Sequence, residues 1–258
     1  MSSEQVEALD AFEQAVTKMV AVAREVVPSS ASAAERAAAV SHLLGLLSGG
    51  IDLLVQRADP RAPLLTPWMT ETRKIFGDSP DAVYTTAPVD NAFRYRMKIR
   101  PGNCVYWSAV VYSKVPSGNI RIVASLNDVG LSPSTDGYHE IRLGGTETTV
   151  PGISWLPLEE GAFWIMIREY FVDDTHLTGE LSIEVLEKQP TNRPPDLSVS
   201  LAAMANWIAS AFSAERWLFD LSAQTPNTEP TTPSGPIPDG LVKTFLPTPD
   251  IAYQGCVW

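Results

Sequence analysis

Carboxylates beside a proline turn are the residues in this chain with the clearest capacity for acid–base chemistry. Asp78 and Asp81 flank Pro80, and Glu169 and Asp173 form a second acidic group further along the chain. Paired carboxylates divide acid and base roles when their environments push their pKa values apart. In a glycosidase, the separation of two such groups sets the stereochemical outcome. We therefore take these four residues as the candidate catalytic set.

A structural explanation competes with this chemistry. Aspartates next to proline commonly accept hydrogen bonds from backbone N–H groups and so hold turns together. Arg168 precedes Glu169 directly, and its guanidinium suits bidentate recognition of a carboxylate. On a strand, Arg168 and Glu169 point to opposite faces. Arg168 therefore fits either a ligand contact or an ion pair with an acidic residue of the first group that locks two strands together.

Aromatic residues on or beside the expected strands form a second kind of site. A sandwich face rich in Tyr and Trp can stack sugar rings or enclose an apolar ligand, although such residues also pack in cores. With the arginine included, the candidate ligand-binding residues are Tyr84, Tyr106, Trp107, Trp155, Arg168 and Tyr170.

Few sequence features indicate a metal site or a cofactor site. Oxygen-rich residues from Asn127 to Asp136 resemble calcium ligands but lack EF-hand spacing. His139, His176 and Asp173 would need long-range convergence to make a two-histidine, one-carboxylate site. Nucleotide-binding glycine loops, the GxSxG nucleophile motif and HExxH are all absent from the sequence. We expect no metal and no cofactor.

Charge and cysteine content limit the expected partners and the expected cellular compartment. The net charge of -11 and pI near 4.7 disfavour nucleic acid and an anionic membrane surface. Only Cys104 and Cys256 are present, without metal-binding spacing, which suits a reducing compartment. We recognise no secretory signal and no apolar run of transmembrane length. The expected location is the cytoplasm.

Helices are predicted at both ends of a β-rich middle. Apolar residues at spacings of three and four indicate helices from Ser3 to Val27 and from Ser32 to Leu54, with a capping box at Ser32–Glu35 and a break or kink near Gly49-Gly50. A third apolar stripe runs from Leu197 to Phe212. We expect the first two helices to form a hairpin against the sandwich, or else a dimerisation face.

In the middle of the chain, apolar and polar residues alternate with a period of two. Phe93 to Arg100 is the clearest strand, and Val105 to Tyr112 is apolar enough for a central position. About seven or eight strands with short turns indicate an antiparallel β-sandwich of jelly-roll type. The predicted fold is mainly β, with a helical hairpin before the sandwich and a helix and extended tail after it.

Four regions follow from these patterns: helices over 1–58, the sandwich over 59–190, a connecting helix over 191–224 and a Pro/Thr-rich linker over 225–258. Thr248-Pro249-Asp250-Ile251-Ala252-Tyr253 repeats the pattern of Ser79 to Tyr84. We interpret this echo as the start of a second, incomplete sandwich.

The segments GDSPDAVYTTAPVD, RYRMKIRPGN and IREYFVDD resemble the tandem jelly-roll proteins catalogued as domain of unknown function 1214, with their relative 1254. The resemblance runs from about Asp59 to Glu187 and weakly to PDIAY. It implies N-terminal helices and two successive sandwiches, of which this sequence keeps the first. The chemistry of that family is not established, so the resemblance implies a fold and not an activity.

Three functions remain open. The first is a binding or assembly module for a small molecule or glycan. The second is a hydrolase that acts on glycosides through its paired carboxylates. The third is a structural subunit. We expect no nucleic acid or membrane partner, and either a homo-oligomer or a partner chain that supplies a second sandwich.

Overall fold

The computed structural model describes residues 3–27, 29, 31–71, 73–75, 79–114, 120–172, 175–187 and 196–222, with the side chains of 3–6 and 213–222 excepted. Its helices are α1 (Ser3–Val26), α2 (Ala33–Ile51), the π-helical turn η1 (Asp52–Gln56) and α3 (Leu197–Ser222). Its strands are β1 (Thr66–Pro67), β2 (Ala82–Pro88), β3 (Tyr95–Arg100), β4 (Tyr106–Lys114), β5 (Ile120–Asn127), β6 (His139–Leu143), β7 (Ile153–Leu156), β8 (Ala162–Tyr170) and β9 (Glu180–Val185).

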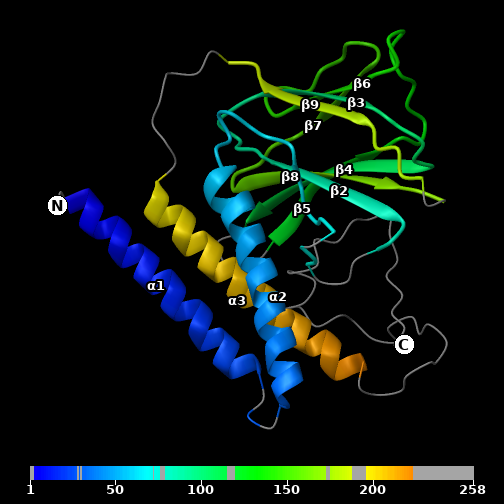
Figure 1. Cartoon of the computed structure of the whole chain (residues 1–258). Coiled ribbons are helices and arrows are strands. Elements are labelled where there is room, and N and C mark those ends of the chain that lie inside the picture. The colour runs from blue at the N-terminus through cyan, green and yellow to red at the C-terminus, as the bar shows by residue number, and fades with distance from the viewer. Residues whose placement is uncertain are drawn as a thin grey trace. The chain divides into compact units, whose positions relative to one another are not determined.

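The chain divides into two compact units (Figure 1). One unit holds the helices together with the short segment around Arg73, and the other holds the strands. The helical unit therefore combines elements from both ends of the described chain. The four regions predicted from sequence stay predictions.

The strand unit is a two-layered sandwich. One sheet has the order β1-β2-β8-β4-β5 and the other has the order β7-β6-β3-β9. This arrangement confirms the prediction of a mainly β fold with helices before and after the sandwich in the sequence. One detail differs, because β6 and β7 pair in parallel while the other strand pairs are antiparallel. Sequence reasoning missed β1 and β7, which at two and four residues are too short to show alternation.

The core lies between the two sheets. Along β3, Tyr95, Met97 and Ile99 are fully buried, whereas the residues between them face the other way. They meet buried side chains of β4 and β8 from the other sheet. β4 lies between β8 and β5 and is buried on both faces, which confirms its predicted central position.

The basic residues of β3 are paired on the outer face of their sheet. Arg96 contacts Glu184 and Arg100 contacts Glu180, both on β9. Lys98 lies 3.9 Å from Asp136. Exposed pairs of this kind contribute up to about 1 kcal/mol each. Their main effect is to neutralise a row of cations within an acidic protein.

In the helical unit, α1 and α2 each pack against α3 more than against one another. The predicted capping box is present, since the Glu35 amide donates to Ser32 Oγ at 3.2 Å and the Ser32 amide donates to Glu35 Oε2 at 2.6 Å. The sequence predicted a break or kink near Gly49-Gly50. α2 ends at Ile51 and the π-helical turn η1 begins at Asp52, so the α-helical repeat changes within two residues of that glycine pair.

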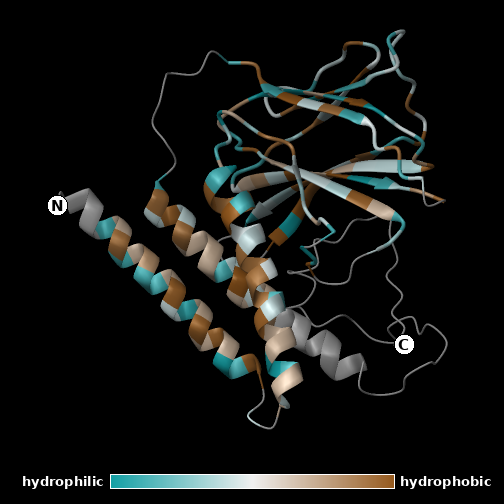
Figure 2. Ribbon diagram, viewed as in Figure 1, coloured by the Kyte–Doolittle hydropathy of each residue, from teal (hydrophilic) through white to brown (hydrophobic). Residues whose placement is uncertain are grey.

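The reason for that glycine pair is close packing. A Cβ added at Gly50 would lie 2.7 Å from Met204 Cγ of α3. The glycine lets two helices approach each other, and the hydrogen bonds of the helix continue past it. Figure 2 shows apolar residues recurring along all three helices.

The segment Ala33–Gln56 is long and apolar enough to cross a membrane by length and composition alone. The mean hydropathy of its most apolar window is 1.7, and 28% of that window is buried. The expectation that no apolar run approaches this length was therefore too strict. Within its unit, α2 packs against α3.

Candidate functional site

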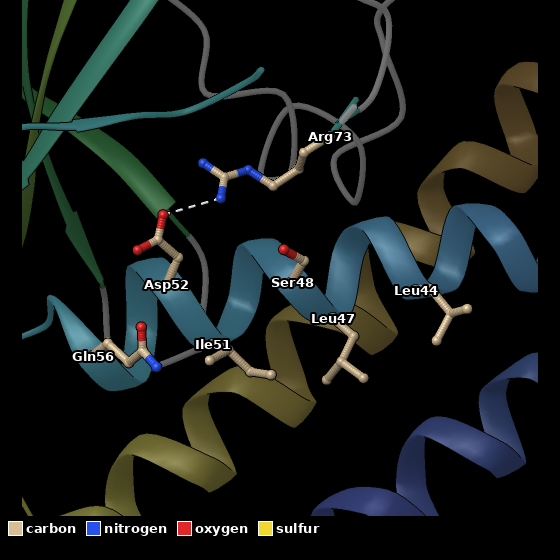
Figure 3. Close-up of a pocket in the computed structure, with 7 residues that line it drawn as sticks. All are labelled: Leu44, Leu47, Ser48, Ile51, Asp52, Gln56 and Arg73. Carbon is tan, nitrogen blue, oxygen red and sulfur yellow. Dashed lines mark hydrogen bonds and ion pairs between the residues drawn. The ribbon is translucent and has the colours of Figure 1, made fainter. Parts of the chain in front are cut away.

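An open pocket of about 420 Å³ lies beside α2 in the helical unit (Figure 3). The pocket is shallow, since Leu44 in its lining is 59% exposed and Ile51 is 37% exposed. We call it the α2 pocket. It is lined by Leu44, Leu47, Ser48, Ile51, Asp52, Gln56 and Arg73.

The helical spacing of α2 gives the pocket two different walls. Leu44, Leu47 and Ile51 recur at intervals of three and four, so they share one side of the helix. Ser48 and Asp52 are four residues apart and lie on the neighbouring side, toward Arg73 (Figure 3). One wall is therefore apolar and the other is polar.

The polar wall contains an ion pair. Arg73 Nη1 donates a hydrogen bond of 3.0 Å to Asp52 Oδ2. The arginine side chain is 8% exposed and the aspartate side chain 26% exposed. Charge-assisted hydrogen bonds of this type are stronger than neutral ones. Because the two charges cancel, the described lining carries no net charge.

The described lining offers groups for binding. The lining contains neither a histidine nor a cysteine, and its only carboxylate is held by Arg73. Elsewhere among the described residues, no group of three or more His, Cys, Asp or Glu is placed to hold a metal ion. The pocket instead offers an apolar surface along one wall, with hydroxyl, amide and ion-pair groups along the other.

Four of the predicted ligand-binding residues do come together, on one face of the β2–β8–β4 sheet. The register pairs Tyr84 with Arg168 and Tyr106 with Tyr170. The two tyrosine rings of the second pair lie 5.8 Å apart, and the Arg168 guanidinium lies 5.9 Å from the Tyr84 ring. Arg168 itself is only 2% exposed, so it forms part of a packed layer.

Tyr112 belongs to the same cluster. It is one of the aromatic residues on the predicted strands, but it is not one of the six candidate ligand-binding residues. Arg168 Nη2 donates a hydrogen bond of 2.7 Å to the Tyr112 hydroxyl, and its guanidinium also lies 5.9 Å from that ring. Both residues lie on strands that alternation predicts. Their contact depends on the β4–β8 register, which a single sequence does not reveal.

The two tryptophans lie apart from this cluster. Trp107 points to the opposite face of β4, where it is 1% exposed within the core and its ring lies 5.2 Å from His139. Trp155 is half-buried on β7, and its Nε1 donates to the Gly144 carbonyl at 3.0 Å. The six residues therefore do not line one common surface.

Of the four candidate catalytic residues, two are described, and these two differ in exposure. Asp78 and Asp173 lie outside the described residues. Asp81 is exposed, and its backbone carbonyl accepts a hydrogen bond of 2.8 Å from the Phe171 amide. Glu169 is only 2% exposed, and its Oε1 accepts a hydrogen bond of 2.7 Å from the Gly179 amide. Its role in catalysis stays a prediction.

Burial also changes the titration of groups near this end of the sandwich. Burial raises the pKa of Glu169, and the hydrogen bond from Gly179 partly opposes that effect. Burial lowers the pKa of His139, against an opposing effect of Asp128. The pKa of the Cys104 thiol is raised to about 11, chiefly by burial and then by the charges of Glu169 and Asp128. These groups favour their neutral forms.

The loop residues considered as calcium ligands have local partners. Asp136 accepts from Ser134 Oγ and from the Tyr138 amide, and the hydrogen bond from Ser134 is the main reason that its pKa is lowered. His176 stacks on Phe171, with ring centroids 4.5 Å apart. Asn127 Oδ1 accepts from the Val129 amide at 3.0 Å. These contacts hold loops and ring stacks together.

The repeat of the Ser-Pro-Asp pattern at Thr248 to Tyr253 lies outside the described residues. The hypothesis of a second, incomplete sandwich stays a prediction. Sequence reasoning also missed the α2 pocket. Its apolar wall was visible as a helical stripe, but Arg73 gave no signal because nothing in the sequence places it beside Asp52.

No protein-family model matches this chain, and no curated protein does. The chain is similar in structure to an uncharacterized protein from Burkholderia cenocepacia, with a TM-score of 0.75 and 23% identity, over 97% of this chain and 68% of that one. The VPA0106 protein from Vibrio parahaemolyticus gives a TM-score of 0.39 and 19% identity, over 59% and 44%. The first similarity shows the fold, and the second is too low to carry an argument.

Proposed function

We propose that this protein binds a small, uncharged amphiphilic molecule in the α2 pocket. The supporting observation is the pairing of an apolar wall, formed by Leu44, Leu47 and Ile51, with a polar wall whose ion pair is already neutral. A medium-chain alcohol or a short-chain glycoside has an apolar chain that matches the apolar wall and hydroxyl groups that match the polar wall. Its chain lies over the leucines and its hydroxyl groups lie at Ser48 and the ion pair.

The neutrality of the polar wall favours an uncharged head group. A ligand carboxylate would place a second negative charge beside Asp52, and a ligand amine would place a second positive charge beside Arg73. Like charges at such short distances repel each other. A hydroxyl can donate to the carboxylate while it accepts from other groups. We therefore expect alcohols and glycosides to bind more tightly than acids or amines of equal length.

The glycan-binding and glycoside hydrolase hypotheses have less structural support. A glycan site on the sandwich would use Tyr84, Tyr106 and Tyr170, which are half-buried. A glycoside hydrolase would need two carboxylates in an open cleft, and Glu169 is buried. The family resemblance adds no activity. The α2 pocket is better supported because it combines volume with two chemically distinct walls.

The proposal places the protein in the cytoplasm as a small-molecule-binding module. The support is a thiol at Cys104 that forms no disulfide and the acidic composition. Fractionation of cells that express the full chain would test this part separately from ligand binding.

Isothermal titration calorimetry with 1-hexanol and 1-octanol tests the binding. We expect saturable binding of both, with octanol up to about fifteenfold tighter because each of its two extra methylenes contributes about 0.8 kcal/mol when buried. Leu44→Ser should weaken octanol binding. Val150→Ser is the matched control, since Val150 is 53% exposed on the sandwich and Leu44 is 59% exposed. Absence of saturable binding, or equal binding by both variants, would overturn the proposal.

A further inference from the structure

A short segment, residues 175–179, contacts the turn that joins β3 to β4 and leads directly into β9. We call this segment the strap. It lies so close to the turn that a Cβ added at Gly102 would lie 1.6 Å from the Leu177 carbonyl oxygen. Leu177 is 66% exposed, and Thr175 and Thr178 are exposed as well. The strap therefore buries little apolar surface, as is usual for segments that open locally.

Two side chains hold the strap against the sandwich. At one end, Asn103 Nδ2 donates to the Thr175 carbonyl at 2.6 Å, and Asn103 Oδ1 accepts from the Leu177 amide at 2.9 Å. At the other end, Glu169 Oε1 accepts a hydrogen bond of 2.7 Å from the Gly179 amide. An asparagine amide keeps its charge at every pH, whereas a glutamate carboxyl group titrates. The two attachments of the strap should therefore differ in their response to pH.

The side chains that face Glu169 on its own side of the sheet carry no positive charge. Its register partners are Val83 of β2 and Trp107 of β4. Cys104 lies close enough that the charges of Glu169 and Asp128 help to raise the pKa of its thiol. These neighbours are apolar, neutral or acidic, so none of them stabilises an ionised carboxylate.

The basic residues described near this end of the sandwich have other positions. Arg168 comes directly before the glutamate on β8 and so points to the opposite face of the sheet. Arg100 of β3 contacts Glu180 on the outer face of the other sheet. Burial lowers the pKa of His139, which favours its neutral form, and His176 of the strap stacks on a phenylalanine ring.

Ionisation of Glu169 is therefore unfavourable while the strap is closed. Burial disfavours the charged form of a carboxyl group. It raises the pKa of Glu169 in the closed state, and the hydrogen bond from Gly179 offsets part of that effect. A protonated carboxyl group still offers its carbonyl oxygen to the Gly179 amide. When the strap opens, water can hydrate the carboxylate, so deprotonation favours the open state.

We propose that Glu169 is a proton-operated latch, which holds the strap closed while its carboxyl group is protonated and releases the strap on deprotonation. Because the closed and open states bind this proton with different affinities, the opening equilibrium depends on pH. The equilibrium constant for opening should rise up to about tenfold per pH unit between the pKa of an exposed glutamate, about 4.3, and the raised pKa of the closed state. Above that range it should stay constant.

Amide hydrogen exchange of the full chain, measured by NMR from acidic to neutral pH, tests the latch. The protection factor corrects for the intrinsic pH dependence of exchange. At Gly179 and Leu177 it should fall as the pH rises, by up to about tenfold per pH unit. The amides of Val110 and Ile165, which are buried at the centre of the sandwich, should not follow the same curve. A protection factor at Gly179 that is independent of pH would overturn the proposal.

Two variants separate the latch from an ordinary attachment. Glu169→Gln keeps an oxygen for the Gly179 amide but cannot ionise, so its protection factor at Gly179 should be independent of pH. Asn103→Ala is the matched control, because it removes the other attachment of the strap. It should lower protection at every pH and keep the pH dependence of the wild type. The same pH dependence in Glu169→Gln as in the wild type would overturn the proposal.

Discussion

The Arg73 guanidinium lies 3.0 Å from the Asp52 carboxylate, and this pair forms the polar wall of the α2 pocket. Asp52 occupies the first position of η1, where the α-helical repeat of α2 ends. Arg73 comes from a segment 21 residues further along the chain. The specificity of the pocket therefore depends on a contact between two separate segments of the helical unit.

Asp52→Asn should change the preferred head group of the ligand. Removal of the carboxylate charge leaves the Arg73 charge to attract an anion, so octanoate should bind more tightly than 1-octanol, opposite to the wild-type order. Competition calorimetry measures both affinities. Glu184→Gln is the control, because it removes an exposed ion-pair partner of Arg96 from the strand unit. An unchanged order of affinities would show that the ion pair does not select the head group.

Gly45 and Gly50 should respond differently to alanine. A Cβ at Gly45 meets nothing within 4 Å, so Gly45→Ala should stabilise the protein by up to about 1 kcal/mol through helix propensity. A Cβ at Gly50 would lie 2.7 Å from Met204 Cγ and 3.3 Å from Ile208 Cδ1. Gly50→Val should cost about 1–3 kcal/mol through overpacking, and Gly50→Ala should lose the stabilisation seen at Gly45. Urea denaturation measures both, and equal effects of alanine would contradict the packing of α2 on α3.

Glu169→Gln should stabilise the protein at neutral pH and lose that advantage in acid. Burial raises the pKa of Glu169 in the folded state. The wild-type residue therefore favours folding when it is protonated, below its unfolded pKa, and this contribution is lost as the pH rises through its folded pKa. Glutamine stays uncharged and keeps an oxygen for the Gly179 amide. Urea denaturation across the acidic to neutral range measures the difference, and a pH-independent difference would contradict a buried, titrating carboxyl.

Tyr112→Phe should destabilise the sandwich by about 1.5–3 kcal/mol. It removes the hydroxyl that accepts a hydrogen bond of 2.7 Å from buried Arg168, and hydrogen bonds to charged groups contribute about that much. Tyr138→Phe is the matched control. The Tyr138 hydroxyl donates at 2.5 Å to the exposed Glu180 carboxylate, so its loss should cost less than about 1 kcal/mol. Comparable losses for the two variants in thermal unfolding would contradict this assignment of Arg168 to a packed layer.

Local periodicity was sufficient to predict most of the fold. The alternation at Tyr95, Met97 and Ile99 predicted both a strand and its buried face. The capping box at Ser32–Glu35 predicted the start of α2. The packing role of Gly50 was not predicted, because a glycine that breaks a helix and a glycine that allows close packing look the same until the partner helix is known. That partner, α3, lies more than a hundred residues away.

The site was harder to predict for the same reason. Tyr84, Arg168 and Tyr170 were selected by residue type, and strand register does bring them together. Residue type could not show that Arg168 is buried, because burial depends on what covers the strand. The α2 pocket requires Arg73 to lie beside Asp52, and no motif or period connects them. The prediction of the site was limited by the unknown spatial positions of residues far apart in the sequence, more than by their chemistry.

Carbon-13 methyl NMR of the full chain during titration with 1-octanol tests the central claim most directly. The account predicts saturable shifts for the methyl groups of Leu44, Leu47 and Ile51, with no saturable shift for Leu181 or Ile183, which pack against the sandwich core. Octanoate should produce weaker shifts at the same residues. Saturable shifts confined to the sandwich, or no saturable shift at the three α2 residues, would contradict a binding function for the α2 pocket.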